Sequence, residues 1–109
     1  MGVQVHFAIL HCYSTDDATE DEAVLRFDDI VFWQGLMKGG RDRNTDKFMV
    51  FPPGKSEAMV KLIDADWPTS DHIGTHVIRR DELGQGWHRA YFQNEDAHYH
   101  LDYEVFNAP

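Results

Sequence analysis

The segment HYHLDYEVF, residues 98–106, alternates apolar and polar side chains over a longer stretch than any other part of the chain. Its residues Tyr99, Leu101, Tyr103 and Val105 occupy every second position. Because successive side chains of an extended strand point to opposite faces, this pattern predicts a strand that buries one face and exposes the other. The same period of two recurs along most of the chain, so the sequence predicts an all-β protein.

Seven further strands are predicted from shorter alternations that turn residues separate from one another. They cover residues 3–9, 23–27, 30–33, 48–51, 58–63, 72–78 and 87–93. In the first of these strands we expect Val3, Val5, Phe7 and Ile9 to face the same side.

Two segments are not expected to be strands. Residues 34–47 are rich in glycine and polar side chains, so we expect them to be irregular. Residues 81–83 are expected to form one helical turn that Gly84 closes. Eight strands in 109 residues leave room only for an antiparallel sandwich or a small barrel, and we expect residues 1–109 to form a single domain.

The composition narrows the classes of function. A formal net charge of -9 argues against binding the phosphate backbone of nucleic acid. No apolar run approaches the roughly 20 residues of a membrane span, and the first residues do not resemble a signal peptide. Cys12 is the single cysteine, which excludes an internal disulfide and a cysteine-based zinc site. We therefore expect a soluble acidic protein that is cytoplasmic or a peripheral membrane protein.

Acidic residues are concentrated in three of the predicted loops. If the strands run alternately up and down, these loops meet at one end of the domain. They carry Asp16, Asp17, Glu20, Asp21, Glu22, Asp64, Asp66, Asp71, Glu95 and Asp96. Carboxylates within about 4 to 6 Å of one another repel, and a bound divalent cation removes that repulsion. Calcium suits such a site, because it accepts about six to eight oxygen ligands in irregular geometry.

The spacing Asp64-Ala65-Asp66 is the strongest part of this pattern. Side chains two residues apart at the mouth of a strand point the same way, so both carboxylates can reach one ion. Asp71, at the start of the next predicted strand, can return to the same ion. The alternative is that the acidic loops are only solvated and keep the protein soluble.

The stretch VKLIDADWPTSDHIG, residues 60–74, resembles the third calcium-binding loop of C2 domains, in which an apolar strand leads into Asp-x-Asp, a short loop and a further Asp. The segment TDDATEDEAVLRF, residues 15–27, looks like the first loop of that family, with Asp17 and Asp21 at its acidic positions and Asp16 as an alternative register. The single strand before this loop is similar to the second of the family's two permuted topologies. The closing residues 84–105 look like the last hairpin of such a sandwich and resemble small bacterial C2-type domains.

This resemblance implies an eight-stranded antiparallel β-sandwich that binds calcium at its loop end and then an anionic partner such as phospholipid. The acidic loops and the resemblance together give a set of expected metal ligands: Asp16, Asp17, Asp21, Asp64, Asp66, Asp71 and Asp96. The rival expectation is a structural or protein-interaction domain, including an immunity or inhibitor protein, in which calcium only stabilises loops.

Two further features favour contact between the loop end and a lipid or another partner. Trp67 lies at the predicted apex of the third loop, where its ring can insert at the level of lipid headgroups. The alternative is that this ring folds back onto the core. A basic patch that can contact lipid phosphates is formed by Lys38, Arg41, Arg43 and Lys47, unless these side chains only balance Asp42 and Asp46.

The histidines raise the question of a zinc site. His98 and His100 are two residues apart on one predicted strand and face outward beside Asp102, which is a common partial zinc site. His88 on the neighbouring strand has inward parity and cannot complete the set. We therefore expect solvated histidines on the strand face rather than zinc ligands.

There is little support in the sequence for an enzyme. His11 and Cys12 are adjacent, so they point to opposite faces of a strand and the imidazole cannot activate the thiol. The chain has no nucleophile elbow and no glycine-rich phosphate loop. We expect a binding module and not an enzyme.

Overall fold

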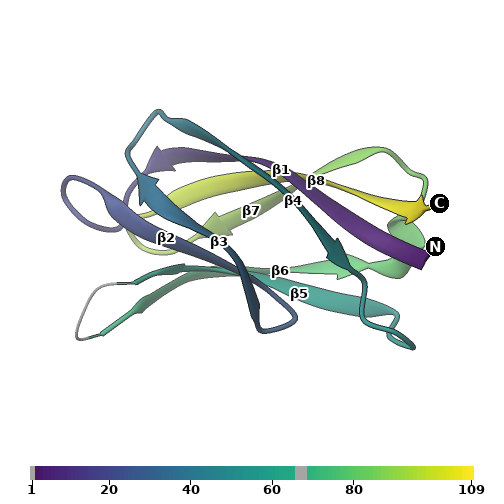
Figure 1. The fold of residues 1–109 in the computed structure, drawn as a ribbon. Helices are drawn as coiled ribbons and strands as arrows, with labels where there is room; N and C mark the ends of the chain where they lie inside the picture. The colour runs from purple at the N-terminus through teal and green to yellow at the C-terminus, as the bar shows by residue number, and fades with distance from the viewer. Residues whose placement is uncertain (1, 66–68) are drawn as a thin grey trace.

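The computed structural model describes residues 2–65 and 69–109, which form a sandwich of two four-stranded antiparallel sheets (Figure 1). One sheet has the strand order β4-β1-β8-β7 and the other the order β3-β2-β5-β6. The strands are β1 Gly2–Ser14, β2 Asp21–Phe27, β3 Ile30–Met37, β4 Asp42–Val50, β5 Glu57–Asp64, β6 Asp71–Arg79, β7 Trp87–Gln93 and β8 His98–Ala108. The predicted all-β class is confirmed, and the sandwich forms rather than the barrel.

The core lies between the two sheets and is made of the inward residues of each strand. In β8, Tyr99, Leu101, Tyr103 and Val105 are all buried, as their spacing predicts. The two sheets meet through aromatic rings: the centroid of the Phe7 ring on β1 lies 4.3 Å from that of Phe32 on β3. Such large rings provide much of the apolar burial that holds the sheets together.

A β-bulge interrupts the alternation of β1. The register of β1 against both of its neighbours shifts between Phe7 and Ile9. Val5 and Phe7 face the core before the shift, whereas Leu10 and Cys12 face it afterwards. The prediction that Ile9 shares the inward face with Phe7 is therefore wrong, because one extra residue reverses the parity of the strand.

The prediction that residues 34–47 are irregular is also wrong. β3 continues to Met37 and β4 starts at Asp42, so that only the turn 38–41 lies between them. β4 is an edge strand that pairs with β1 alone, and most of its side chains are exposed. A strand that buries little needs no apolar alternation, which explains why only its end, within the predicted strand 48–51, was recognised and residues 42–47 were not. The buried Thr45 is an exception, and its hydroxyl donates to the Phe7 carbonyl at 2.8 Å.

The predicted helical turn exists as a short 3-10 helix, η1 Arg80–Glu82, one residue earlier than expected. The Glu82 carboxylate accepts the Arg79 amide at 2.8 Å and the Tyr103 hydroxyl at 2.5 Å. Gly84 follows with a φ of +75°, a left-handed conformation that favours glycine. The turn thus closes the connection from β6 to β7 and ties it to β8.

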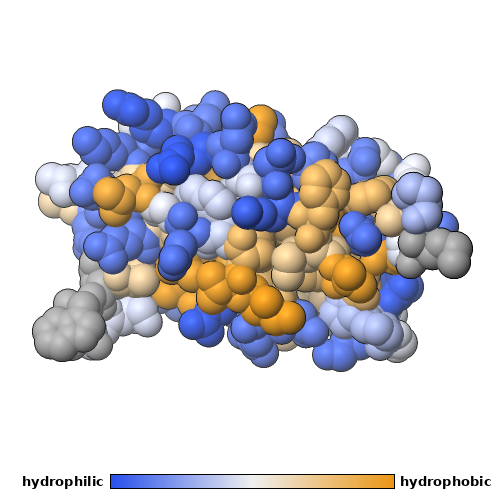
Figure 2. Space-filling view, viewed as in Figure 1, coloured by the Kyte–Doolittle hydropathy of each residue, from blue (hydrophilic) through white to orange (hydrophobic). Residues whose placement is uncertain are grey.

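Four loops share one end of the sandwich, and both termini lie at the other end (Figure 1). The loops connect β1 to β2, β3 to β4, β5 to β6 and β7 to β8. In the side view of Figure 2, hydrophilic residues dominate the upper part, towards β4, and an apolar band crosses the lower part. Ile30, Val31 and Leu36 of β3 are among the exposed apolar side chains. No helix in the described part of the chain is long and apolar enough to cross a membrane.

Candidate metal centre at the acidic loop end

Asp64 is the last residue of β5 and is completely buried, with 0% of its surface exposed. Its Oδ1 accepts the Glu22 amide at 2.9 Å. Within residues 2–65 and 69–109, no hydrogen-bond partner reaches its buried Oδ2. Burial is the main cause that raises the pKa of Asp64 to about 8; the Glu22 amide opposes this shift, and the nearby Asp21 and Asp17 carboxylates add to it. A carboxylate in this position is poorly stabilised by the protein itself.

Asp16 and Asp17, in the loop from β1 to β2, lie beside Asp64. One carboxylate oxygen from each of the three residues lies within 4.8 Å of the others. Calcium binds oxygen ligands at about 2.3–2.6 Å, so ligands on opposite sides of one ion are separated by roughly 5 Å. The spacing of these three oxygens is therefore compatible with ligation of one calcium ion.

Asp21 has a different position from the one expected of a ligand. Its Oδ1 accepts the Asp17 amide at 2.9 Å, and its Oδ2 accepts the Asp16 amide at 2.9 Å and the Tyr99 hydroxyl at 2.5 Å. Both oxygens are thus occupied by donors of the protein, and the side chain is buried. Asp21 holds the backbone of the loop that presents Asp16 and Asp17.

Asp71 and Asp96 lie at the margin of the cluster. Asp71 starts β6 and pairs in register with Asp64. Asp71 and Asp96, together with Asp16 and Asp17, line an open cavity of about 470 Å³. Neither belongs to the three-residue group with oxygens within 4.8 Å. Asp66, a further predicted ligand, and Trp67 lie outside the described residues.

Asn94 is a component of the site that the sequence analysis missed. Its Nδ2 donates to Asp16 Oδ1 at 2.9 Å, and its Oδ1 accepts the amides of Asp96 and Ala97 at 2.9 and 2.7 Å. This residue therefore connects the loop before β8 to the loop after β1. The sequence could have indicated the turn, since Asn at the start of a turn commonly accepts the amides of the residues that follow. It could not have indicated the bond to Asp16.

The predicted basic patch is divided. Lys38 and Arg41 lie in the exposed turn from β3 to β4, at the same end as the acidic loops. Arg43 lies on β4, where it donates to the Leu36 carbonyl at 3.0 Å and sits 5.5 Å from the centroid of the Trp33 ring. Lys38 and Arg41 remain candidates for a contact at the loop end, whereas Arg43 is held against β3.

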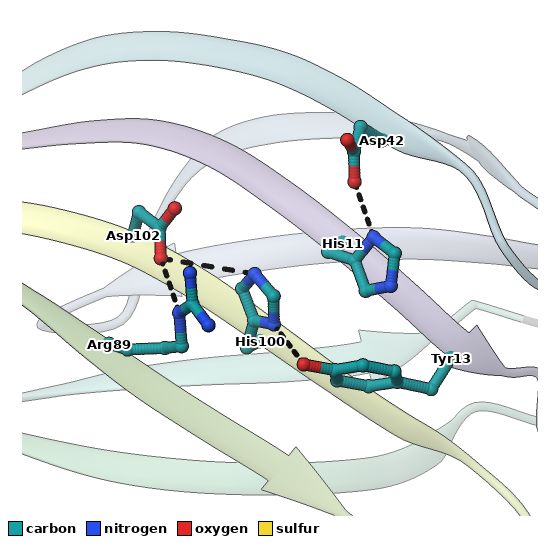
Figure 3. A network of polar contacts seen from close by, with 6 residues as sticks. All are labelled: His11, Tyr13, Asp42, Arg89, His100 and Asp102. Atoms are coloured by element: carbon teal, nitrogen blue, oxygen red, sulfur yellow. Dashed lines mark hydrogen bonds and ion pairs between the residues drawn. The ribbon is translucent and has the colours of Figure 1, made fainter.

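The histidines do not form a zinc site of the usual kind. Among the described residues, only Asp16, Asp17 and Asp64 bring three potential ligand atoms within 4.8 Å of one another. His98 and His100 have the outward parity that was predicted, but His100 is only 8% exposed, so the expectation of solvated histidines is wrong for this residue. Neighbouring rings on the same face cover it, as Figure 3 illustrates for His11 and Tyr13.

Comparison with known proteins identifies similar folds among solved structures. No protein-family profile matches the sequence, and no curated protein matches it. The structure resembles a solved structure of a C2 domain with a TM-score of 0.64 and 10% identity, covering 94% of this chain and 96% of that one.

Two longer proteins are also similar in part. A structure that holds the two C2 domains of extended synaptotagmin 2 aligns with a TM-score of 0.56 at 17% identity, over 94% of this chain and 40% of that chain. Human GIVD cytosolic phospholipase A2 aligns with a TM-score of 0.54 at 12% identity, over 97% of this chain and 17% of that chain. The fold is therefore C2-like, as the resemblance in the sequence implied.

Proposed function

We propose that this chain is a calcium-binding C2-like module that binds an anionic partner, foremost phospholipid, through its loop end. The observation that supports this most directly is Asp64: its carboxylate is fully buried, its Oδ2 has no hydrogen-bond partner in the described part of the chain, and it lies beside Asp16 and Asp17. A protein normally pairs such an oxygen, because leaving it unpaired is unfavourable by about 1–3 kcal/mol. A cation ligated by Oδ2 would supply the missing interaction.

Calcium fits the donor set better than zinc or magnesium. The three clustered ligands are all carboxylates, which are the hard oxygen donors that calcium prefers. They come from the β1–β2 loop and from the end of a strand, an irregular arrangement that the tight octahedron of magnesium disfavours. Asp66, Asp71 and Asp96 are the candidates for the remaining coordination positions.

The bound ion would change the charge that the loop end presents to a partner. Without a cation, the clustered carboxylates repel an anionic headgroup. A bound calcium ion would reduce this repulsion and leave coordination positions open for phosphate or carboxylate oxygens of the partner. Lys38 and Arg41 lie in a neighbouring loop. Each basic side chain near an anionic surface contributes roughly 1 kcal/mol to binding. Trp67 is the candidate for insertion at the headgroup level.

Calcium binding can be tested by isothermal titration calorimetry on the wild type, Asp17→Asn, Asp64→Asn and a matched control. The control is Asp29→Asn, which removes an exposed carboxylate from the turn between β2 and β3. Asp29 has a φ of +66°, and Asn tolerates this left-handed conformation well. We expect Asp17→Asn and Asp64→Asn to weaken calcium binding at least tenfold, and Asp29→Asn to leave it unchanged. Equal effects of all three would show that only the net charge is sensed.

Partner binding requires a second experiment. Sedimentation with vesicles of phosphatidylserine and phosphatidylcholine, each with calcium or with chelator, distinguishes the alternatives. We expect pelleting only with phosphatidylserine and calcium. Calcium binding without pelleting would favour the structural or protein-interaction role instead.

A further inference from the structure

The outer face of the β4-β1-β8-β7 sheet carries two groups of aromatic rings. The first group contains His6, Phe48, Trp87 and Phe106: the His6 ring stacks on Phe48 with centroids 4.1 Å apart and meets the edge of Trp87 at 5.4 Å. Trp87 is 54% exposed, although tryptophan is highly buried on average. An ordered but exposed indole on a flat sheet face is a common element of binding surfaces.

The second group lies further along the same face, around His100. The Tyr13 hydroxyl and His100 Nδ1 are hydrogen-bonded at 2.6 Å, and the His11 ring stacks on His100 with centroids 4.9 Å apart (Figure 3). Asp42 pairs with His11 from the edge strand. Tyr13 and Tyr91 leave about half of their surface exposed at 44% and 54%. The rings of this group are therefore linked to one another by hydrogen bonds and ring contacts.

A groove of about 360 Å³ lies on this face, lined by Ala8, Ile9, Trp87, His88, Arg89 and Asp102. In the strand register, Asp102 of β8 lies between Arg89 of β7 and Ile9 of β1. These three residues form a row across the sheet, and the two aromatic groups lie in the rows on either side of it. The bulge in β1 creates this arrangement, because it turns Ile9 outward and puts the small Ala8 beside it. The volume falls within the lower range of small-molecule sites.

The charges of the groove lining are already matched. Arg89 Nε donates to Asp102 Oδ1 at 2.9 Å, as Figure 3 shows. Among the described residues, no other Lys, Arg, Asp or Glu lines the groove. The groove lining itself therefore offers neither an uncompensated positive charge for an anion nor an uncompensated carboxylate for a basic peptide. Glu104 pairs in register with Trp87 but is not part of this lining. It does offer guanidinium donors and carboxylate oxygens to a ligand that both accepts and donates hydrogen bonds.

We propose that this groove binds a neutral oligosaccharide, with Trp87 as the stacking platform and the Arg89–Asp102 pair as the hydrogen-bonding group. The C–H face of a pyranose ring is weakly positive and packs against the negative face of an indole. Its hydroxyls both donate and accept, so they match a paired guanidinium and carboxylate better than a ligand of one charge sign does. The site is independent of the acidic loop end.

Tryptophan fluorescence titrations test the proposal, carried out in chelator so that calcium plays no part. The probes are cellohexaose, xylohexaose, mannohexaose and N-acetylchitohexaose, with a galacturonate hexamer as the anionic counterpart and a proline-rich peptide as the alternative occupant of an aromatic groove. We expect at least one neutral hexamer to bind and to shift the emission, and neither the galacturonate hexamer nor the peptide to do so.

Variants identify the groove as the origin of the signal. Trp87→Ala and Arg89→Ala should each weaken glycan binding at least tenfold in calorimetry, and both side chains are exposed enough for the variants to fold, which circular dichroism verifies. Trp33→Phe, on the opposite sheet, should leave affinity unchanged. The proposal is overturned if no neutral hexamer binds at millimolar concentration, if only the peptide or the galacturonate hexamer binds, or if Trp87→Ala binds glycan as well as the wild type.

Discussion

At the scale of single residues, the loop end contains carboxylates in two different hydrogen-bonding environments. Asp64 has an oxygen without a donor in the described residues, whereas both oxygens of Asp21 are occupied by amides and a hydroxyl. The sequence placed both residues in one expected ligand set, because spacing alone does not distinguish a carboxylate with an oxygen that lacks a donor from one that organises a loop. The distinction depends on where the Tyr99 hydroxyl lies, and that residue is 78 positions away from Asp21.

We expect Asp64→Asn to change stability with opposite sign in the two metal states. The folded pKa of Asp64, about 8, is above its ordinary value of 3.8, so its contribution to stability is complete below about pH 4 and is lost as the pH rises through about 8. Asparagine keeps an acceptor for the Glu22 amide and adds a donor towards Asp17. In chelator at pH 8.5 the variant should therefore be more stable than the wild type by about 1–3 kcal/mol. In saturating calcium it should be less stable.

Urea denaturation of both proteins at pH 5 and pH 8.5, with chelator and with calcium, measures these differences. In chelator, the advantage of Asp64→Asn should shrink at pH 5, where the wild-type carboxyl keeps its proton in the folded state. The same loss of stability in all four conditions would contradict the prediction and would identify Asp64 as an ordinary acceptor for the Glu22 amide.

Tyr99→Phe tests the structural role of Asp21. The change removes a buried hydroxyl that donates to Asp21 Oδ2 at 2.5 Å and leaves the Asp16 amide as the partner of that oxygen. We expect a loss of about 1–3 kcal/mol in the free energy of unfolding, because the donor to a buried carboxylate is lost. Tyr91→Phe, which removes a hydroxyl from a half-exposed ring, is the control and should change stability by less than about 0.5 kcal/mol.

At the scale of strands, the sequence predicted the elements that bury one face and missed those that do not. The alternation of β8 located its core-facing residues correctly, since Tyr99, Leu101, Tyr103 and Val105 all lie on the core side of a central strand. Only residues 48–50 of the edge strand β4 were predicted, and its first part, residues 42–47, was missed because few of its side chains need to be apolar. The bulge in β1 was missed because Ile9 fits either face as an apolar residue, and only the pairing with Asp102 reveals that it faces outward.

Gly74→Ala tests how the two sheets approach each other where β6 meets β7. A Cβ at this position would lie 2.8 Å from Phe92 Cα, so that backbone and not a flexible side chain would have to move. We expect a destabilisation of about 1–3 kcal/mol, the usual range for overpacking in a core. Gly39→Ala is the control, because the nearest atom to its Cβ would be at 3.4 Å and its φ is ordinary. A comparable loss in both variants, measured by thermal denaturation, would mean that the effect is not one of close packing.

At the scale of the whole molecule, the acidic side chains gather at the end of the sandwich where the loops that carry them meet. The net charge of -9 is distributed so that several carboxylates meet where the β1–β2 loop, the β7–β8 loop and the start of β6 converge. The sequence predicted this convergence from strands that run alternately up and down. It also predicted that Asp16, Asp17 and Asp64 belong to one acidic group. The groove beside Trp87 could not be predicted, because it depends on a bulge and on the order of strands in the sheet.

Calcium should raise the melting temperature of the intact protein, because a ligand that binds only the folded state stabilises it by mass action. At a free concentration about 100 times the dissociation constant, the gain is roughly 2.7 kcal/mol. Scanning calorimetry after chelation, with and without millimolar calcium, measures the shift, and magnesium at the same concentration controls for screening of charge. An unchanged melting curve in calcium would refute the proposed site.

The hydrogen bonds that hold the β1–β2 loop also affect the kinetics of the proposed ion binding. Asp21 fixes the amides of Asp16 and Asp17, and Asn94 fixes the Asp16 carboxylate, all without a metal. If the proposed ion binds, the loop backbone at Asp16 and Asp17 and the Asp16 carboxylate are already held in place, so little loop ordering should remain to slow association. The association rate would then depend mainly on diffusion and on loss of water from the ion. Differences in affinity among variants of this loop should appear mainly in how fast calcium leaves.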